Sequence, residues 1–132
     1  MKKVVIDTNV LVSGIFWKGT PYLVIKSWAD GRFKLVISPE ILKEYQRVLV
    51  EVSKKHPGVD IGPVLEIIEL NGEMVKTKPM KGVCSDPDDD KFIAAAIASV
   101  SDFIVSGDKA LLDVGLYQHV RILNPTHFLK EL

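Results

Sequence analysis

The chain has 132 residues and a mass of 14.7 kDa, which is enough for one domain with a sizeable core, so we expect a single domain over residues 1–132. Its 17 basic and 17 acidic side chains give a formal net charge of zero, which excludes a bulk positive field that would attract nucleic acid. Hydrophobic residues make up 47% and charged residues 26%, which excludes a disordered chain. The single cysteine, Cys84, excludes an intrachain disulfide and a thiolate metal cage.

The sequence gives no sign of a membrane segment or of an export signal. No apolar run approaches the ~20 residues that a membrane span needs. The start of the chain has lysines followed by apolar residues, as a signal peptide does, but Asp7 and Asn9 interrupt the apolar segment. We therefore expect a cytoplasmic protein, which also suits the lone cysteine.

Short stretches rich in β-branched and aromatic residues predict strands. The first two are continuous apolar runs, as in strands that are covered on both faces, and the third alternates, as an edge strand does. In chain order these stretches are 3–6, 33–37, 74–78, 102–106 and 120–123. They are the candidate strands of one sheet.

Helical patterns lie between these strands. The clearest is 39–52, where apolar residues recur with the helical period and Ser38 is a natural N-cap. The other helical patterns are 21–29, 63–70, 91–100 and a short one at 109–112. Because helices alternate with strands, the chain predicts an α/β fold: a three-layer domain with a central parallel sheet of about five strands and helices on both faces.

Acidic residues gather where such a fold places its ligands, beyond the carboxyl ends of the strands. Asp7 directly follows the first predicted strand, and Asp108 lies just after the fourth. The run 86–90 contains Asp86, Asp88, Asp89 and Asp90 and heads a predicted helix. Glu44 lies on the border of the apolar stripe of helix 39–52, from which it can reach the same edge of the sheet.

Clustered carboxylates repel one another and raise each other's pKa values unless a cation is present. Hard divalent cations such as Mg²⁺ and Mn²⁺ prefer oxygen ligands. The histidines, at 56, 119 and 127, are scattered and form no zinc pattern. The acids therefore predict a magnesium or manganese site that activates water and neutralises a phosphodiester during hydrolysis.

Each acid also has a purely structural interpretation. Asp7 can cap a strand-to-helix turn, and Asp108 can begin the short helix 109–112. Glu44 can pair with Arg47 on an exposed helix face. Within the run 86–90, we expect Asp88 or Asp89 to be the capping or solvated residue and Asp90 to be the ligand.

Segments that carry these acids resemble PIN-domain nucleases, in the same order and spacing over nearly the whole chain. The segments are 4–11, in which Asp7 ends the first strand; 38–45, with Glu44; 86–96, in which Asp90 heads an alanine-rich helix; and 105–112, with Asp108. The resemblance implies a metal-dependent endoribonuclease, similar to the VapC-like toxins of toxin–antitoxin pairs. Such proteins commonly form homodimers and are held inactive by an antitoxin protein.

The resemblance also implies roles for individual residues. These are Asp7, Glu44 and Asp90 as ligands of Mg²⁺ or Mn²⁺, Asp108 as a weaker or second-site ligand, and Asn9 and Ser106 as supporting hydrogen-bonding residues. RNA is the implied substrate. Whether one or two metal ions bind stays open, because Ala110 stands where many relatives have an aspartate.

Other functions compete with this interpretation. A haloacid-dehalogenase-like phosphatase also has an aspartate after its first strand, but it needs a second one where Asn9 stands. A phospho-receiver module needs a lysine after the fifth strand, where 124–126 reads Asn-Pro-Thr. A PIN-like domain could also serve only as a non-catalytic binding module, which the complete set of acids disfavours.

Overall fold

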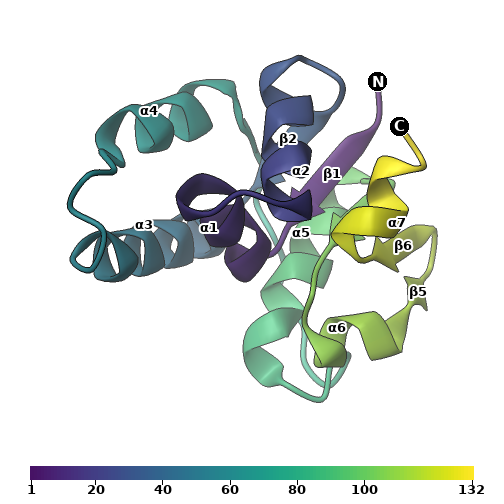
Figure 1. Ribbon diagram of the computed structural model, residues 1–132. Helices are drawn as coiled ribbons and strands as arrows, with labels where there is room; N and C mark the ends of the chain where they lie inside the picture. The colour runs from purple at the N-terminus through teal and green to yellow at the C-terminus, as the bar shows by residue number, and fades with distance from the viewer.

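The computed structural model describes residues 1–132, which are organised around one mixed sheet (Figure 1). The strands are β1 (Lys3–Ile6), β2 (Lys34–Ile37), β3 (Glu73–Met74), β4 (Phe103–Val105), β5 (Leu116–Tyr117) and β6 (Val120–Leu123). They form a six-stranded sheet in the order β3-β2-β1-β4-β6-β5. All neighbours are parallel except β5 and β6, which are antiparallel. The α/β architecture is as predicted, with one strand more than expected.

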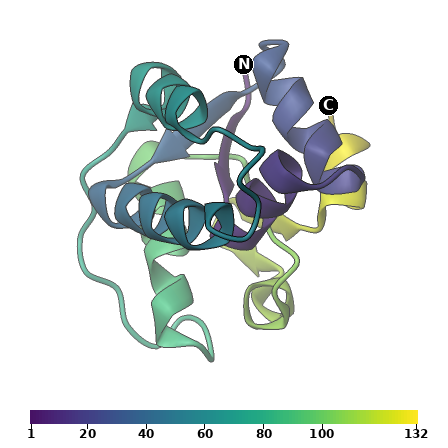
Figure 2. The same ribbon diagram turned by 60° about the vertical axis from the view of Figure 1, so that its left-hand side comes forward.

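Helices flank this sheet, and the two views in Figures 1 and 2 show them wrapped around it. They are α1 (Thr8–Phe16), α2 (Thr20–Ala29), α3 (Pro39–Ser53), α4 (Gly62–Asn71), α5 (Asp90–Ser99), α6 (Lys109–Val114) and α7 (Pro125–Leu129), with a 3-10 turn η1 (Pro87–Asp89) before α5. Helix α2 packs against α1 and α7, whereas α5 packs against β1, β2 and β4. Even the longest helix, α3 with 15 residues, is too short to cross a bilayer.

The central strands form the core because their side chains are buried on both faces. Every residue from Val4 to Ile6, from Leu35 to Ile37 and from Phe103 to Val105 is buried. This is why these strands appear in the sequence as continuous apolar runs and not as alternating ones. The register pairs Ile6 with Val105, so β1 and β4 end at the same level. Asp7 and Ser106 therefore leave the sheet side by side.

Helices α1 and α2 approach each other unusually closely at Gly14. A Cβ atom at Gly14 would lie 2.5 Å from Cγ1 of Ile25 and 2.7 Å from the carbonyl oxygen of Pro21. Only glycine leaves room for this contact, which seats α1 against its neighbour. The helix then begins at the end of β1, where Asp7 is its N-cap.

The C-terminal segment completes the sheet and the core. Strand β6 pairs with β4, and α7 places Phe128 in the interior. The buried Phe128 ring lies edge-on to Phe33 and Phe103, with ring centroids 5.3 and 5.7 Å away. The chain termini lie at the same end of the molecule, away from α6 (Figures 1 and 2).

The structure differs from the predicted elements in detail. The third strand is Glu73–Met74 and not 74–78. The N–H of Val75 donates to the Ile37 carbonyl oxygen, and beyond this hydrogen bond the chain leaves the sheet. Strand β5 and helices α1 and α7 were not predicted as elements. The remaining strands and helices lie where the pattern of apolar residues predicts them.

Candidate active site

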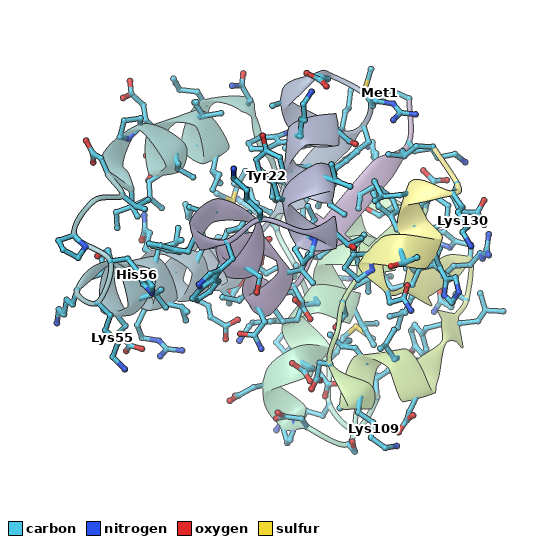
Figure 3. All side chains as sticks on the ribbon, in the orientation of Figure 1. Met1, Tyr22, Lys55, His56, Lys109 and Lys130 are labelled. Carbon is cyan, nitrogen blue, oxygen red and sulfur yellow. The ribbon has the colours of Figure 1, made fainter.

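A hollow of about 230 Å³, here called the acidic pocket, lies at the carboxyl ends of β1 and β4. It is lined by Asp7, Thr8, Asn9, Glu44, Arg47, Val48, Asp86, Asp88, Asp89, Phe92 and Asp108. Figure 3 shows side-chain oxygens in the region between α1, the start of α5 and the end of α6 where Lys109 is labelled. The structure thus brings together Asp7, Glu44 and Asp108 with Asn9, but it does not bring Asp90 to this pocket.

Asp7 is fixed by neutral donors from two elements. Its side chain is only 4% exposed, and its Oδ1 accepts a hydrogen bond from the Val10 N–H at 2.9 Å, which caps α1. Its Oδ2 accepts a hydrogen bond from the hydroxyl of Ser106, and this hydroxyl oxygen accepts one from the Asp108 N–H at 2.9 Å. Burial raises the pKa of Asp7 above its ordinary value, against the effect of these donors. Ser106 therefore links the two aspartates.

Glu44 is held in the pocket by α1 and α5. The hydroxyl of Thr8 donates to its Oε2, and the ammonium group of Lys91 lies 2.6 Å from its Oε1. The hydroxyl of Tyr45, the next residue on α3, donates to the carbonyl oxygen of Ile6 and so fixes α3 on β1. Arg47 pairs with Glu51 at 3.5 Å and not with Glu44. Glu44 is thus a pocket residue and not part of an exposed pair on its own helix.

The four aspartates of the run 86–90 make different contacts. Asp86 caps the turn η1, because its side chain accepts a hydrogen bond from the Asp88 N–H at 3.0 Å. Asp88 and Asp89 both line the pocket, but Asp88 is exposed and Asp89 is half-buried. Asp90 is only 3% exposed, and its Oδ1 accepts a hydrogen bond from the Cys84 N–H at 2.7 Å. Asp90 thus fastens the preceding loop and lines a neighbouring hollow.

Negative charge is concentrated around Asp89. The Oδ2 atoms of Asp89 and Asp108 are buried without a hydrogen-bond partner. The pKa of Asp89 is raised to about 8, and burial is the largest cause. A hydrogen bond that a protonated Asp89 can donate to Asp108 raises the pKa further. The negative charges of Asp108, Asp86 and Asp7 add to this effect. Such an arrangement favours a proton or another cation in the pocket.

The pocket offers the donor set of a hard divalent cation. Its possible ligands are carboxylate oxygens, and no histidine or cysteine lines it. The buried, unpartnered oxygens of Asp89 and Asp108 lack the positive charge that would offset their desolvation. No group of three or more His, Cys, Asp or Glu side chains is arranged so that it could hold a metal ion in this structure. The carboxylates would have to move closer together around such an ion.

Sequence reasoning missed several residues of the pocket. The sequence predicts that Asp88 or Asp89 is a capping or solvated residue. It gives no role at the metal to Thr8 and Arg47, which line the pocket, or to Lys91, which pairs with Glu44. Pro87, directly after Asp86, marks the start of a turn, but this signal does not distinguish Asp89 from Asp90. No signal links Lys91 to Glu44, because the two residues lie on different helices.

Comparison with known proteins agrees with this geometry. A family model described as PIN domain matches residues 3–110. The matched stretch contains every acidic residue that lines the pocket. Comparison with curated proteins gave no match. The chain belongs to the PIN domain family.

Proposed function

We propose that this protein is an endoribonuclease that uses Mg²⁺ or Mn²⁺ to hydrolyse RNA phosphodiester bonds in the acidic pocket. PIN domains are generally nucleases, and membership of the family supports that class of activity. The observation that carries the proposal is the pair of buried, unpartnered carboxylate oxygens of Asp89 and Asp108 beside Asp7. A proton shared between these oxygens or a metal ion would offset their burial, and a metal ion would also promote hydrolysis of a phosphodiester.

The residues that would hold the metal are Asp7, Asp89 and Asp108, with Glu44 as a further ligand from the side of the pocket. A bound Mg²⁺ or Mn²⁺ supplies activation of water and neutralisation of phosphate charge. We give Asp89 the role that the resemblance implies for Asp90, because Asp90 lines a different hollow and is bonded to the Cys84 N–H.

The chain's own residues prepare the pocket for this reaction. The Ser106 hydroxyl contacts both the carboxylate of Asp7 and the backbone N–H of Asp108. It therefore fixes the position of the Asp7 carboxylate relative to the backbone of Asp108. Arg47 lines the same pocket, and its pair with Glu51 is an exposed one, which contributes little to stability. Its guanidinium group is therefore available to a phosphate of the substrate.

A comparison of two isosteric substitutions tests the assignment. Asp89→Asn should lower RNA cleavage about 100-fold or more, because a neutral amide is a poor ligand for a hard cation and also fails to balance its charge. Asp90→Asn is the matched control: the amide oxygen can still accept the Cys84 N–H, so we expect it to keep more than about half of the activity. Cleavage of a fluorescent RNA with Mn²⁺, together with thermal melts, measures both effects. Loss of cleavage in the Asp90 variant alone would contradict the assignment.

We also propose that the protein acts in the cytoplasm as the toxin of a toxin–antitoxin pair and forms a homodimer, on the strength of the resemblance of its four acidic segments to such toxins. Expression of the wild type in a bacterium that lacks the antitoxin should arrest growth, whereas the Asp89→Asn variant should not. Sedimentation analysis should give a dimer. Equal growth of the two strains, with no RNA cleavage by the purified protein, would favour a non-catalytic binding module.

A further inference from the structure

Lys91 is a largely buried cation beside the acidic pocket, where it pairs with Glu44 of the pocket lining. It lies in the first turn of α5, and its Nζ is 2.6 Å from Oε1 of Glu44. The side chains of this pair are 22% and 19% exposed, which makes it the most shielded ion pair in the protein. A shielded charge interacts more strongly with its neighbours than an exposed one, so the Lys91 ammonium group acts more strongly on Glu44 than a surface lysine would.

Glu44 differs from Asp7 in what holds it. Asp7 receives only neutral donors, from the Val10 N–H and the Ser106 hydroxyl. Glu44 receives one neutral donor, from Thr8 on Oε2, and a full positive charge on Oε1. A second cation that binds the Glu44 carboxylate must therefore share it with Lys91 or displace the Lys91 ammonium group.

A second hollow offers space for the Lys91 ammonium group away from Glu44. Lys91 lines this hollow, which has a volume of about 550 Å³ and adjoins the acidic pocket at Asp88. Lys43 and Lys78 line this second hollow as well, and neither forms an ion pair, so it already accommodates ammonium groups. Lys91 thus stands at the boundary between the two spaces.

We infer that Lys91 is a positioning residue for Glu44 and that its ammonium group competes with the divalent metal for this carboxylate. In the metal-free protein, Lys91 holds Glu44 toward the pocket and offsets part of the repulsion among the acids. When a divalent ion enters, Lys91 gives up Oε1 and turns toward the second hollow. Lys91 thereby sets the metal concentration at which the site fills. This inference rests on the proposed function, since it assumes that Glu44 is a ligand.

Metal binding without RNA gives the direct test. Lys91→Met keeps most of the length of the side chain and removes its charge, so Mn²⁺ should bind about tenfold more tightly, because the competing cation at the ligand is gone. Lys91→Arg keeps the charge and should stay within about threefold of the wild type. Lys26→Met is the matched control, since it removes an exposed lysine that pairs with Asp30 on α2. Calorimetric titration of the full chain with Mn²⁺ measures all of them.

A merely structural lysine would behave differently. Lys91→Met should melt at a lower temperature than the wild type in chelator, yet gain more stability from Mn²⁺. In a Glu44→Gln background, the same substitution should no longer tighten Mn²⁺ binding, because there is no carboxylate to compete for. Unchanged or weaker Mn²⁺ binding by a folded Lys91→Met protein would overturn the inference. Lys91→Gln provides the same comparison if the methionine variant does not fold.

The outcome is separable from that of the proposed function. If the wild type cleaves no RNA but Lys91→Met still binds Mn²⁺ more tightly, the nuclease proposal fails and the competition stands. If the wild type cleaves RNA and binds Mn²⁺ as tightly as Lys91→Met does, the nuclease proposal stands and the competition by Lys91 is overturned. If neither protein binds Mn²⁺ at millimolar concentration, both are overturned.

Discussion

Asp89 and Asp108 each bury one carboxylate oxygen that has no hydrogen-bond partner. Burial and then the proximity of Asp108 raise the pKa of Asp89 to about 8. Near neutral pH, the metal-free pocket therefore keeps a proton on Asp89 for much of the time. A divalent ion must displace this proton, so metal binding should release protons and strengthen as the pH rises.

The same shift makes the stability of the metal-free protein depend on pH. The pKa of Asp89 rises from an ordinary value of 3.8 to about 8, so between these values the folded state holds a proton that the unfolded state has lost. The contribution of Asp89 to folding stability therefore falls as the pH rises through this window. Melting temperatures in chelator from pH 4.5 to 8.5 should fall more for the wild type than for Asp89→Asn. Parallel curves for the two proteins would contradict this explanation.

The site residues that could be predicted are those that a strand or a helix face locates. Asp7 and Asp108 follow β1 and β4 directly, and Glu44 borders the apolar stripe of α3, so simple geometry places them at one edge of the sheet. The run 86–90 is different, because it enters α5 through a 3-10 turn. Such a turn has about 3.0 residues per turn and shifts which aspartate faces inward, so Asp89 and Asp90 could not be told apart from the sequence.

At the scale of elements, the position of α1 is decided by packing more than by local preference. Its sequence contains several β-branched residues and Gly14, which are poor helix formers, so it was not predicted. The Asp7 cap and the contacts of α1 with α2 and α3 outweigh this preference. Helix α3 shows the opposite case, because its amphipathic pattern, its Ser38 cap and Pro39 all agree, and it was predicted almost to its ends.

The close approach of α1 and α2 leads to a prediction about stability. Gly14→Ala would place a methyl group 2.5 Å from Ile25 Cγ1 and 2.7 Å from the Pro21 carbonyl oxygen, so the helices must separate. We expect a loss of about 1–3 kcal/mol in the free energy of unfolding, as for other overpacked positions. Gly58→Ala is the control, because a Cβ there meets nothing within 4 Å. Urea denaturation compares them, and equal midpoints would show that α1 can shift without cost.

At the scale of the whole molecule, a net charge of zero leaves RNA binding to local groups. The second hollow beside the acidic pocket carries Lys43 and Lys78, whose side chains are exposed and form no ion pair. Phosphates that flank the scissile bond would reach these lysines if the strand crosses from one hollow to the other. The acids of both hollows limit this attraction, so binding should be weak and sensitive to salt.

Removal of these two lysines should weaken RNA binding without a change in the metal site. In an Asp7→Asn background that prevents cleavage, Lys43→Gln with Lys78→Gln should lower the affinity for a short RNA about three- to tenfold and reduce its dependence on salt. Lys34→Gln, at the opposite edge of the sheet where β2 begins, serves as the control. Fluorescence anisotropy at several salt concentrations measures both quantities. An RNA affinity that falls equally in the control would indicate a general effect of charge and no defined path of the RNA across the second hollow.

The stretch that matches the family ends at residue 110, but the sheet does not end there. Strand β6 covers the outer side of β4, and the Phe128 ring fills the space between Phe33 and Phe103. A protein shortened to the matched stretch would present β4 as a bare edge beside an open apolar hole. Such an edge recruits strands from other molecules, so the truncated protein would precipitate and not act as a minimal enzyme. The segment after α6 is thus a protective cover for the part of the chain that matches the family.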